Sequence, residues 1–414
     1  MPKNGGAARK PSSPRALFFG MKGFRRNHPP DNSNYPLEEG EVFMARAWMK
    51  AALAGMAVMA LSAPVHAADT IKIGVPGAHS GDLVSYGMPS LNAARIVADE
   101  YNAKGGILGK QIEIIAEDDQ CKPELGTNAA TKLLSEGAVA IMGSICSGAT
   151  KAALPIYNDA KIVSISPSAT TPELTQKGDH PYFFRTVASD DMSGHLAGTF
   201  AKDKLGLKKV ALLHDKGDYG RGFVNYAREM LEKGGVEIVL EEGITAGAVD
   251  YGAVIQKIRK SGADGIIFGG YHPEASKLVQ QLAKKKLDIP FIGPDGVKDE
   301  QFIKVAGKNA EGVYATGPTD VSKLPMNIQA RENHKKKYNS EAGAFYDNAY
   351  SATIALLEAI KAAGSTDSQK IMEALRTNLV DTPLGKIKFD AKGDTEGAGF
   401  SIYEVKNGAF VELK

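Results

Sequence analysis

The sequence is poor in several features that would indicate a particular class of function. It contains two cysteines and one tryptophan in 414 residues, and its formal net charge is only +2. Nine of the 50 Lys and Arg residues and four of the 48 Asp and Glu residues lie in the first 67 positions, which leaves 41 basic against 44 acidic residues in 68–414. Residues 68–414 therefore lack the basic excess of a nucleic-acid-binding protein, and no nucleic-acid partner is predicted.

Long apolar runs and common catalytic motifs are also missing. After residue 67 the sequence has no run of about 18 uninterrupted apolar residues, as a transmembrane helix would need. No Gly-x-Gly-x-x-Gly follows the first predicted strand, Ser147 lacks the Gly-x-Ser-x-Gly context of a hydrolase, and the eight histidines show no metal-binding spacing. His214-Asp215 is open to interpretation as a catalytic pair, but a polar loop closing a strand is the favoured interpretation. The sequence predicts neither an enzyme nor a cofactor.

The first 67 residues differ in character from the rest. Residues 44–67 have the pattern of a secretory signal, with two basic residues, a short apolar stretch and the small-residue motif Val65-His66-Ala67. We expect cleavage after this motif and export from the cytoplasm; an uncleaved signal anchor is the alternative. Residues 1–43 are rich in Pro, Gly and Arg and precede a second plausible start at Met44, so we expect no fold there.

Both cysteines, Cys121 and Cys146, lie in the part expected to be exported. An even number of cysteines outside the cytosol favours a disulfide, here between residues 25 positions apart. Two buried free thiols are the alternative. Neither cysteine has a Cys or His nearby at the spacing of a zinc site, so no metal is predicted.

Strands and helices alternate along most of residues 70–293. In the first half, strands are expected at 70–77, 111–117, 139–145, 161–165 and 182–186, with helices at 89–103, 123–135 and 149–158. In the second half, strands are expected at 209–214, 236–241, 263–270 and 290–293, with helices at 192–205, 220–233, 251–260 and 273–286. Two sequential sets of similar size predict an α/β protein with two doubly wound parallel-sheet lobes. The remainder contains predicted helices at 331–338 and 347–363 and a β run at 400–405 and 409–413.

Small hydroxyl residues follow two neighbouring predicted strands, where helices begin. They are Ser147 after the third strand and Ser168 and Thr170 after the fourth. Ligands of parallel sheets bind at the carboxyl ends of strands, where helix N-termini present free N–H groups. These residues therefore predict a small anion-binding cradle. Neither Ser/Thr turn contains Lys or Arg, so a carboxylate suits it better than a polyphosphate.

Aromatic and acidic residues occur at the carboxyl ends of further predicted strands. Tyr86, Tyr219, Tyr271 and Asp295 all lie in such positions. Together with the cradle they describe a cleft for a zwitterion with an apolar side chain. In this hypothesis the hydroxyls and amides bind the carboxylate, Asp295 binds the ammonium, and the tyrosines line the rest.

Nine short segments, spread over nearly all of the part expected to be exported, carry a family resemblance. They are residues 102–107, 118–121, 146–147, 165–175, 215–220, 243–247, 269–274, 293–297 and 390–394. Jointly they resemble the leucine/isoleucine/valine-binding proteins of bacterial ABC importers, which are type I periplasmic binding proteins.

The resemblance implies two lobes joined by three crossovers, which close on the ligand like a hinge. The N-terminal lobe would comprise 68–188 and about 319–396, and the C-terminal lobe 189–318 and about 397–414. The implied function is capture of a branched-chain amino acid in the periplasm, by a monomer, and its delivery to a membrane permease. The implied disulfide is Cys121–Cys146.

The resemblance also implies a role for each site residue. Ser147 and Thr170, with backbone amides, would bind the ligand carboxylate. The Ser168 carbonyl and the Thr170 hydroxyl, on either side of Ala169, would meet the ammonium together with Asp295. The side-chain pocket would be formed by Tyr86, Tyr219, Tyr271 and Phe345. Family members often have Glu where this chain has Asp295, so the ammonium contact is expected to be longer, water-bridged or dependent on tighter closure.

Three other functions remain open from the sequence. The same fold could bind another apolar or small polar amino acid, an amide or an aromatic acid. A secreted α/β enzyme, such as a glycosyl transferase or a reductase, would need a phosphate loop or a catalytic constellation that the sequence does not contain. A ligand-sensing module would need an attached signalling segment.

Overall fold

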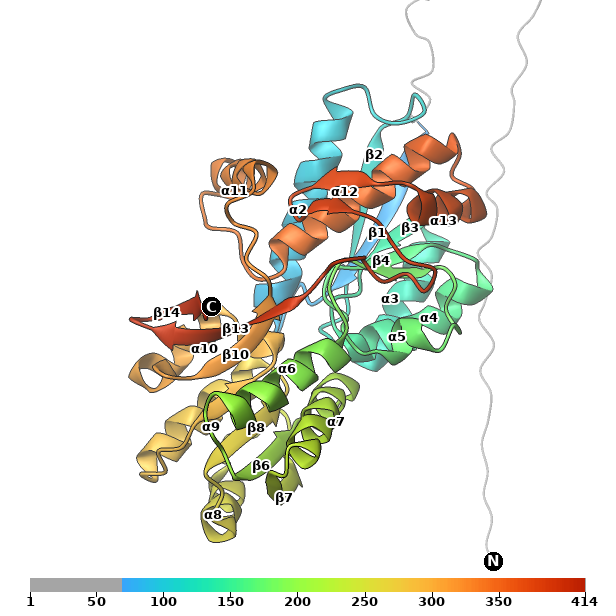
Figure 1. Cartoon of the computed structure of the whole chain (residues 1–414). Helices are drawn as coiled ribbons and strands as arrows, with labels where there is room; N and C mark the ends of the chain where they lie inside the picture. Colours follow the sequence, from blue (N-terminus) through green and yellow to red (C-terminus); the bar gives the residue numbers. More distant parts are fainter. Residues whose placement is uncertain (1–68, 414) are drawn as a thin grey trace, which may run out of the picture. The chain divides into compact units, whose positions relative to one another are not determined.

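The computed structural model describes residues 69–413, and within them the chain forms two large sheets covered by helices and one small two-stranded sheet (Figure 1). The predicted leader of residues 1–43 and the predicted signal of residues 44–67 lie outside this range. No helix in residues 69–413 is long and apolar enough to cross a membrane.

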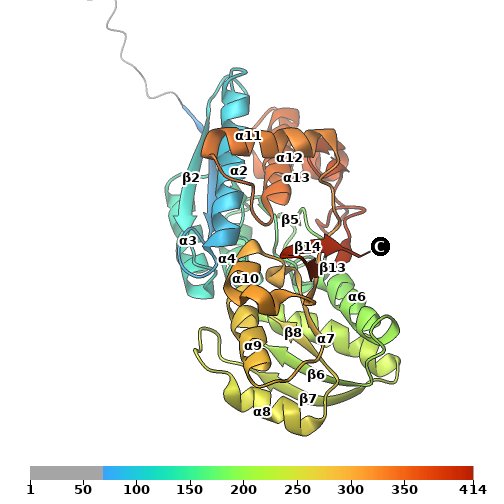
Figure 2. The same cartoon turned by 90° about the vertical axis from the view of Figure 1, so that its left-hand side faces the viewer.

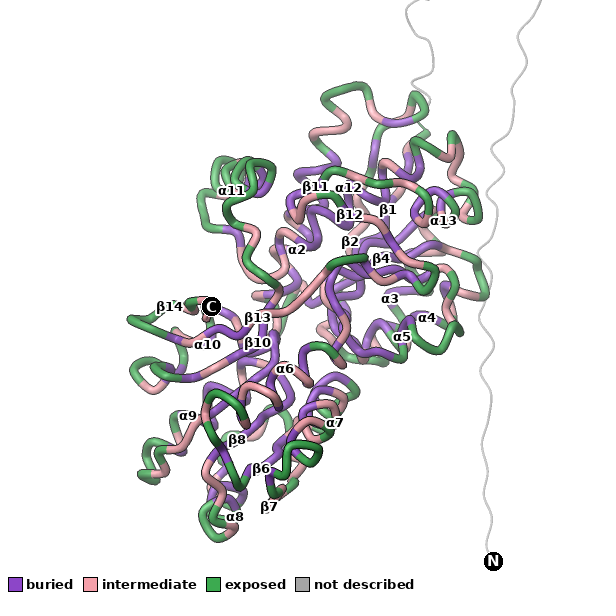
Figure 3. Tube along the Cα trace, in the orientation of Figure 1, coloured by how far each residue is buried: buried purple, intermediate pink, exposed green. Residues whose placement is uncertain are grey.

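The first sheet has five parallel strands in the order β2-β1-β3-β4-β5. They are β1 (Ile71–Gly77), β2 (Ile112–Asp118), β3 (Ala140–Met142), β4 (Ser164–Ser166) and β5 (Phe183–Arg185). The central strands are apolar runs because helices cover both faces of the sheet. One face packs against α2 (Val84–Asn102) and α12 (Tyr346–Ala363), and the other against α3 (Pro123–Ser135) and α4 (Ser147–Asp159). Figure 3 shows the buried residues concentrated along these strands and the facing helix surfaces.

The second sheet has seven strands in the order β14-β13-β10-β9-β8-β6-β7. The parallel strands are β6 (Lys209–His214), β7 (Glu237–Gly243), β8 (Gly265–Gly269), β9 (Phe291–Gly293) and β10 (Tyr314–Pro318). The hairpin of β13 (Phe400–Lys406) and β14 (Ala409–Glu412) extends it antiparallel to β10. One face packs on α6 (Asp190–Asp203) and α7 (Asp218–Lys233), and the other on α8 (Gly252–Ser261), α9 (His272–Lys284) and α10 (Glu300–Ala306).

We call the first sheet with its helices the first lobe and the second sheet with its helices the second lobe; Figure 2 shows them one above the other. The chain passes between the sheets three times. The first crossover is residues 186–189, between β5 and α6. The second is residues 319–324, between β10 and α11 (Pro325–Tyr338), and the third is residues 388–399, between β12 (Gly385–Ile387) and β13. The predicted architecture of two doubly wound lobes with three crossovers is therefore present.

Some elements differ from the sequence prediction. α2 begins at Val84 and contains Pro89, whereas the prediction placed the helix start at Pro89. Proline favours the first turn of a helix, but inside a helix it removes one backbone hydrogen bond, a loss that the buried face of α2 offsets. Elements that the prediction missed are α10, β10, α13 (Ser368–Thr377), β11 (Val380–Thr382) and β12.

Candidate functional site

A cavity of about 20 Å³ lies between the two lobes, at the carboxyl ends of their strands. Its lining residues are Tyr86, Ile145, Cys146, Ser147, Ser168, Tyr219, Tyr271, Asp295, Gly296 and Phe345. Seven of the nine predicted ligand-binding residues are therefore brought together at one cavity, and Ala169 and Thr170 do not line it.

The predicted hydroxyl cradle joins the ends of β3 and β4. Ser147 is the first residue of α4, so it lies beside backbone N–H groups that the helix itself leaves unpaired. The Ser147 Oγ accepts a hydrogen bond from the Thr171 amide at 3.3 Å. The Ser168 Oγ donates to the Ile145 carbonyl at 2.7 Å, which ties the two strand ends together. A carboxylate at this edge would meet a helix N-terminus and a buried hydroxyl.

The disulfide predicted between Cys121 and Cys146 is present, with a Cα–Cα distance of 5.3 Å. The alternative of two buried free thiols is therefore wrong. Cys146 immediately precedes Ser147 and is the N-cap residue of α4. Cys121 has a positive φ of 58°, and its amide donates to Asp119 Oδ1 at 2.8 Å. The bond therefore fixes the start of α4 against the loop that follows β2.

Thr170 and Ala169 lie just behind the cavity and are fully buried. The Thr170 hydroxyl donates to Asp190 Oδ2 at 2.8 Å, and the Asp190 amide donates back to the Thr170 carbonyl at 2.9 Å. Burial, reinforced by the nearby charge of Asp295, raises the pKa of Asp190 well above its usual range. Sequence reasoning missed Asp190, because an acid that follows Ser189 at the start of α6 has the pattern of an ordinary helix start.

Asp295 is the acidic residue that the second lobe contributes to the cavity. It begins a short 3₁₀ turn after β9 and is 2% exposed. Its Oδ1 accepts hydrogen bonds from the Tyr219 hydroxyl and, at 3.1 Å, from the Gly296 amide. Burial raises the pKa of Asp295 to about 6, although these hydrogen bonds and Lys298 oppose the shift. Among the described residues, its Oδ2 has no hydrogen-bond partner. A cation in this cavity would satisfy that oxygen.

Three tyrosines and Phe345 form the aromatic wall of the cavity. The Tyr86 hydroxyl donates to the Gly296 carbonyl at 2.6 Å, and the Gly296 amide donates to the Tyr219 hydroxyl at 2.8 Å. The ring centroids of Tyr219 and Tyr271 are 5.0 Å apart, and those of Tyr86 and Phe345 are 5.8 Å apart. Burial raises the pKa of each tyrosine well above its usual value. The hydroxyls therefore stay neutral. The rings form an apolar wall, and hydrogen bonds with Gly296 hold the hydroxyls of Tyr86 and Tyr219 in place.

The lobes are held together around this cavity by contacts between them. Besides the bond from Tyr86 to Gly296, Ser85 Oγ lies 3.2 Å from His272 Nε2, and Lys151 Nζ lies 3.0 Å from Asp218 Oδ1. A volume of about 20 Å³ accommodates about one water molecule. An amino acid would therefore require movement of the lobes or of the aromatic side chains. In residues 69–413 no group of three or more His, Cys, Asp or Glu side chains is placed to hold a metal ion.

Residues 70–409 match the family described as periplasmic binding protein. The leucine-, isoleucine-, valine-, threonine-, and alanine-binding protein of Pseudomonas aeruginosa is 36% identical over 368 residues, which cover 89% of this chain and 97% of that protein.

Solved structures show the same fold. The branched-chain amino acid transporter substrate binding protein of Streptococcus pneumoniae, in complex with isoleucine, matches with a TM-score of 0.74 and 31% identity, over 83% of this chain and 100% of that one. An ABC transporter solute binding protein of Rhodopseudomonas palustris BisB5, in complex with 3,4-dihydroxybenzoic acid, has a TM-score of 0.72 and 26% identity, over 83% of this chain and 96% of that one. These matches confirm the resemblance and the predicted fold: the chain belongs to the periplasmic binding protein family, with the type I fold.

Proposed function

We propose that this protein captures branched-chain amino acids between its two lobes and delivers them to an ABC importer. The observation that carries the proposal is the pairing of two opposite recognition elements across one cavity. The first lobe contributes the hydroxyl and helix N-terminus at Ser147, and the second contributes the carboxylate of Asp295, whose Oδ2 has no hydrogen-bond partner within residues 69–413. This polarity matches the carboxylate and the ammonium of an α-amino acid.

The predicted residues that line the cavity keep their roles in this proposal, whereas the Thr170 hydroxyl, which donates to Asp190, is not assigned to the ammonium. Ser147 and the loop at Thr170 bind the ligand carboxylate through a hydroxyl and backbone amides. The Ser168 carbonyl and Asp295 bind the ammonium, with Asp190 as a second acid behind Thr170. The aromatic wall surrounds the aliphatic side chain. Burial of an apolar side chain between such rings is favourable by about 1.5–3 kcal/mol.

The cellular setting follows from the same proposal. Relatives of this chain are substrate-binding components of ABC transporters, which supports a permease partner. We infer that the protein acts in the periplasm as a monomer, without catalytic activity. The predicted export signal and the disulfide are consistent with an oxidising compartment.

Calorimetric titration of the purified chain with leucine, isoleucine and valine tests the proposal. Threonine and alanine belong in the same series, because the relative from Pseudomonas aeruginosa is named for all five. The expected result is micromolar or tighter binding of the branched-chain amino acids. N-acetyl-leucine, which has no ammonium, should bind far more weakly. Equal binding of leucine and N-acetyl-leucine would contradict the role of Asp295.

A second candidate ligand class is the aromatic carboxylates. The relative from Rhodopseudomonas palustris BisB5 was solved with 3,4-dihydroxybenzoic acid. The raised pKa of Asp295 would let a protonated carboxyl group face a ligand without an ammonium. Titration with 3,4-dihydroxybenzoate decides between the classes, since tight binding of this acid and none of leucine would select the second candidate.

A further inference from the structure

We propose that Arg185 and Asp394 are a positioning pair for the ligand site. The pair sets the shape of the ligand loop, residues 166–175, and fastens that loop to two of the three crossovers. The ligand-binding role of this loop rests on the proposed function. The contacts of the pair are properties of the fold and are independent of which ligand binds.

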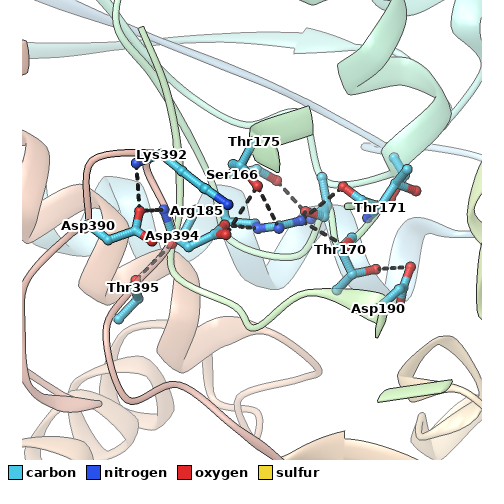
Figure 4. A network of polar contacts seen from close by, with 12 residues as sticks. Ser166, Thr170, Thr171, Thr175, Arg185, Asp190, Asp390, Lys392, Asp394 and Thr395 are labelled. Carbon is cyan, nitrogen blue, oxygen red and sulfur yellow. Dashed lines mark hydrogen bonds and ion pairs between the residues drawn. The ribbon is translucent and has the colours of Figure 1, made fainter. Parts of the chain in front are cut away.

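Arg185 is the last residue of β5, and its side chain is completely buried. Its Nη1 donates to three successive carbonyls of the ligand loop, those of Thr170 at 2.8 Å, Thr171 at 3.0 Å and Ala169 at 3.3 Å. Its Nη2 donates to the Thr175 Oγ1 at 2.8 Å (Figure 4). One planar guanidinium therefore holds both ends of the segment 169–175 in a single geometry.

One of the carbonyls that Arg185 holds is coupled directly to the cradle, because the Thr170 carbonyl and the Thr171 amide belong to the same peptide plane. The Ala169 amide donates to Ser166 Oγ at 2.9 Å, and the Thr171 amide donates to Ser147 Oγ at 3.3 Å. Because Arg185 holds the Thr170 carbonyl on one side of its peptide plane, the Thr171 amide of that plane is directed to the other side, toward Ser147. The guanidinium therefore sets where the loop meets the start of α4, although it does not line the cavity itself.

Asp394 connects this cluster to the third crossover. Its Oδ1 accepts from Arg185 Nε at 2.6 Å, and its Oδ2 accepts from Thr175 Oγ1 at 3.1 Å. The backbone runs beside β5, because the Arg185 amide donates to the Gly393 carbonyl at 2.9 Å and the Thr395 hydroxyl donates to the Arg185 carbonyl at 2.7 Å. The third crossover is therefore attached to the ligand loop by both backbone and charge.

The first crossover lies directly between Arg185, the last residue of β5, and Asp190, the first residue of α6. The Thr170 carbonyl accepts from both Arg185 and the Asp190 amide, and the Thr170 hydroxyl donates to the Asp190 carboxylate. Figure 4 shows this continuous chain of contacts from Asp390 and Asp394 through Arg185 to Thr170 and Asp190. A displacement of Thr170 by a ligand therefore acts on both ends of the first crossover and, through Arg185 and Asp394, on the middle of the third.

A buried ion pair is a poor way to stabilise a fold, since apolar residues of similar volume often do as well. In this protein the side chains of the pair form hydrogen bonds with carbonyls of the ligand loop and link that loop to the third crossover, and within residues 69–413 they do not bond to the backbone of the sheet strands. This use is expected of residues that fix one geometry for binding. If the pair has this role, a small change in it will weaken ligand affinity more than a substitution elsewhere that only lowers the stability of the protein.

Two conservative variants test the pair. Asp394→Asn keeps the acceptor for Nε and removes the charge, and Arg185→Lys keeps the charge and loses the fork that reaches three carbonyls. Each variant should raise the Kd for leucine at least tenfold in calorimetry, under conditions where the protein remains folded. In hydrogen exchange without added ligand, amides of residues 166–175 and 390–395 should exchange faster than in the parent.

Two controls separate positioning from stability. Ile360→Val shortens a fully buried side chain of α12, far from the loop, and should lower the unfolding temperature with an unchanged Kd. Arg228→Lys changes the Arg228–Glu241 ion pair in the second lobe and should change neither quantity greatly. The proposal fails if both test variants bind leucine within twofold of the parent, or if Ile360→Val raises the Kd as much. If the parent itself does not bind leucine, the proposed function fails. The positioning role of the pair is then judged by hydrogen exchange alone, and it fails if amides of residues 166–175 and 390–395 exchange as slowly in the variants as in the parent.

Discussion

Asp295 is an acidic residue in a buried environment that disfavours its ionised form. It is buried, and one of its carboxylate oxygens has no hydrogen-bond partner among the described residues. An ammonium in the cavity loses its hydration, so it needs this charge close by. Asp295→Ala should therefore weaken leucine binding by about 3–5 kcal/mol, the cost of removing one partner from a buried pair. Asp295→Asn should be nearly as harmful. Calorimetric titration measures both, and binding of leucine by Asp295→Ala within a few-fold of the parent would place the ammonium elsewhere.

The same residue should make binding depend on pH. Burial raises the pKa of Asp295 to about 6, so the free carboxyl group becomes protonated as the pH falls through that value. Only the ionised form pairs with an ammonium, and affinity is therefore greatest above pH 6. The Kd for leucine should rise by about tenfold between pH 7 and pH 5, as expected when one proton competes with the ligand. The weak binding left in Asp295→Asn should not follow this curve. A Kd for the parent that is constant over this range would contradict the assignment.

The disulfide acts at the scale of one residue pair. Cys121–Cys146 closes a loop of 25 residues next to Ser147. Cys121→Ser together with Cys146→Ser should lower the free energy of unfolding by about 3 kcal/mol, because the unfolded chain regains loop entropy. The Kd for leucine should also rise, since the start of α4 is released. Chemical denaturation and titration measure the two effects separately, and a stable double variant with unchanged unfolding would show that the crosslink contributes nothing.

At the scale of elements, α7 and β8 approach so closely that side chains are excluded between them. A Cβ on Gly220 would lie 2.4 Å from the Gly269 carbonyl oxygen, whereas a Cβ on Gly222 in the same helix would meet no atom within 4 Å. Gly220→Ala should therefore destabilise the protein by about 1–3 kcal/mol, the usual cost of overpacking. The same substitution should also weaken leucine binding, because Tyr219, which lines the cavity, is the residue directly before Gly220. Gly222→Ala is the matched control and should stabilise by about 0.5–1 kcal/mol. Thermal and chemical unfolding measure the stability of both variants. Equal changes in stability would contradict a close contact between α7 and β8 at Gly220.

Most elements were predictable because their signals are local. The βα alternation placed β6 and α3 at their observed bounds, and Ser147 and Ser168 lie at the carboxyl ends of β3 and β4 and line the cavity there. β10 was missed because Gly317 and Pro318 make Tyr314–Pro318 a weak strand sequence, and its place between β9 and β13 determines its conformation. Strand pairing between segments that are distant in the sequence produces no recognisable sequence pattern in either segment alone.

The site was only partly predictable for the same reason. The residues that line the cavity follow strands directly, whereas Asp190 and Asp394 act through contacts with residues 20 and 209 positions away. Asp190 looks like an ordinary residue at the start of a helix, and Asp394 lies in a turn of the third crossover. Only the folded arrangement shows that one guanidinium, that of Arg185, joins the loop beside them.

At the scale of the whole molecule, an amino acid fits the small cavity only when the lobes or the aromatic side chains move, and separation of the lobes would break the contacts between them. The Lys151–Asp218 ion pair joins α4 of the first lobe to α7 of the second, and both side chains are nearly half exposed. An exposed pair of this kind contributes at most about 1 kcal/mol, and salt screens it. Because it forms only between closed lobes, its small energy should appear in affinity and not in the stability of either lobe.

Lys151→Ala tests this idea against Lys132→Ala, which removes an exposed lysine that pairs with Glu117 inside the first lobe. Lys151→Ala should raise the Kd for leucine by up to about fivefold, the equivalent of 1 kcal/mol, and the difference should shrink in 0.5 M salt. The same variant should increase the radius of gyration of the ligand-free protein in small-angle scattering, because a contact of the closed form is lost. Lys132→Ala should change neither measurement. If both lysine variants bind leucine alike, the ion pair between the lobes does not contribute to closure, and the contacts of Tyr86 with Gly296 and of Ser85 with His272 must hold the lobes together without it.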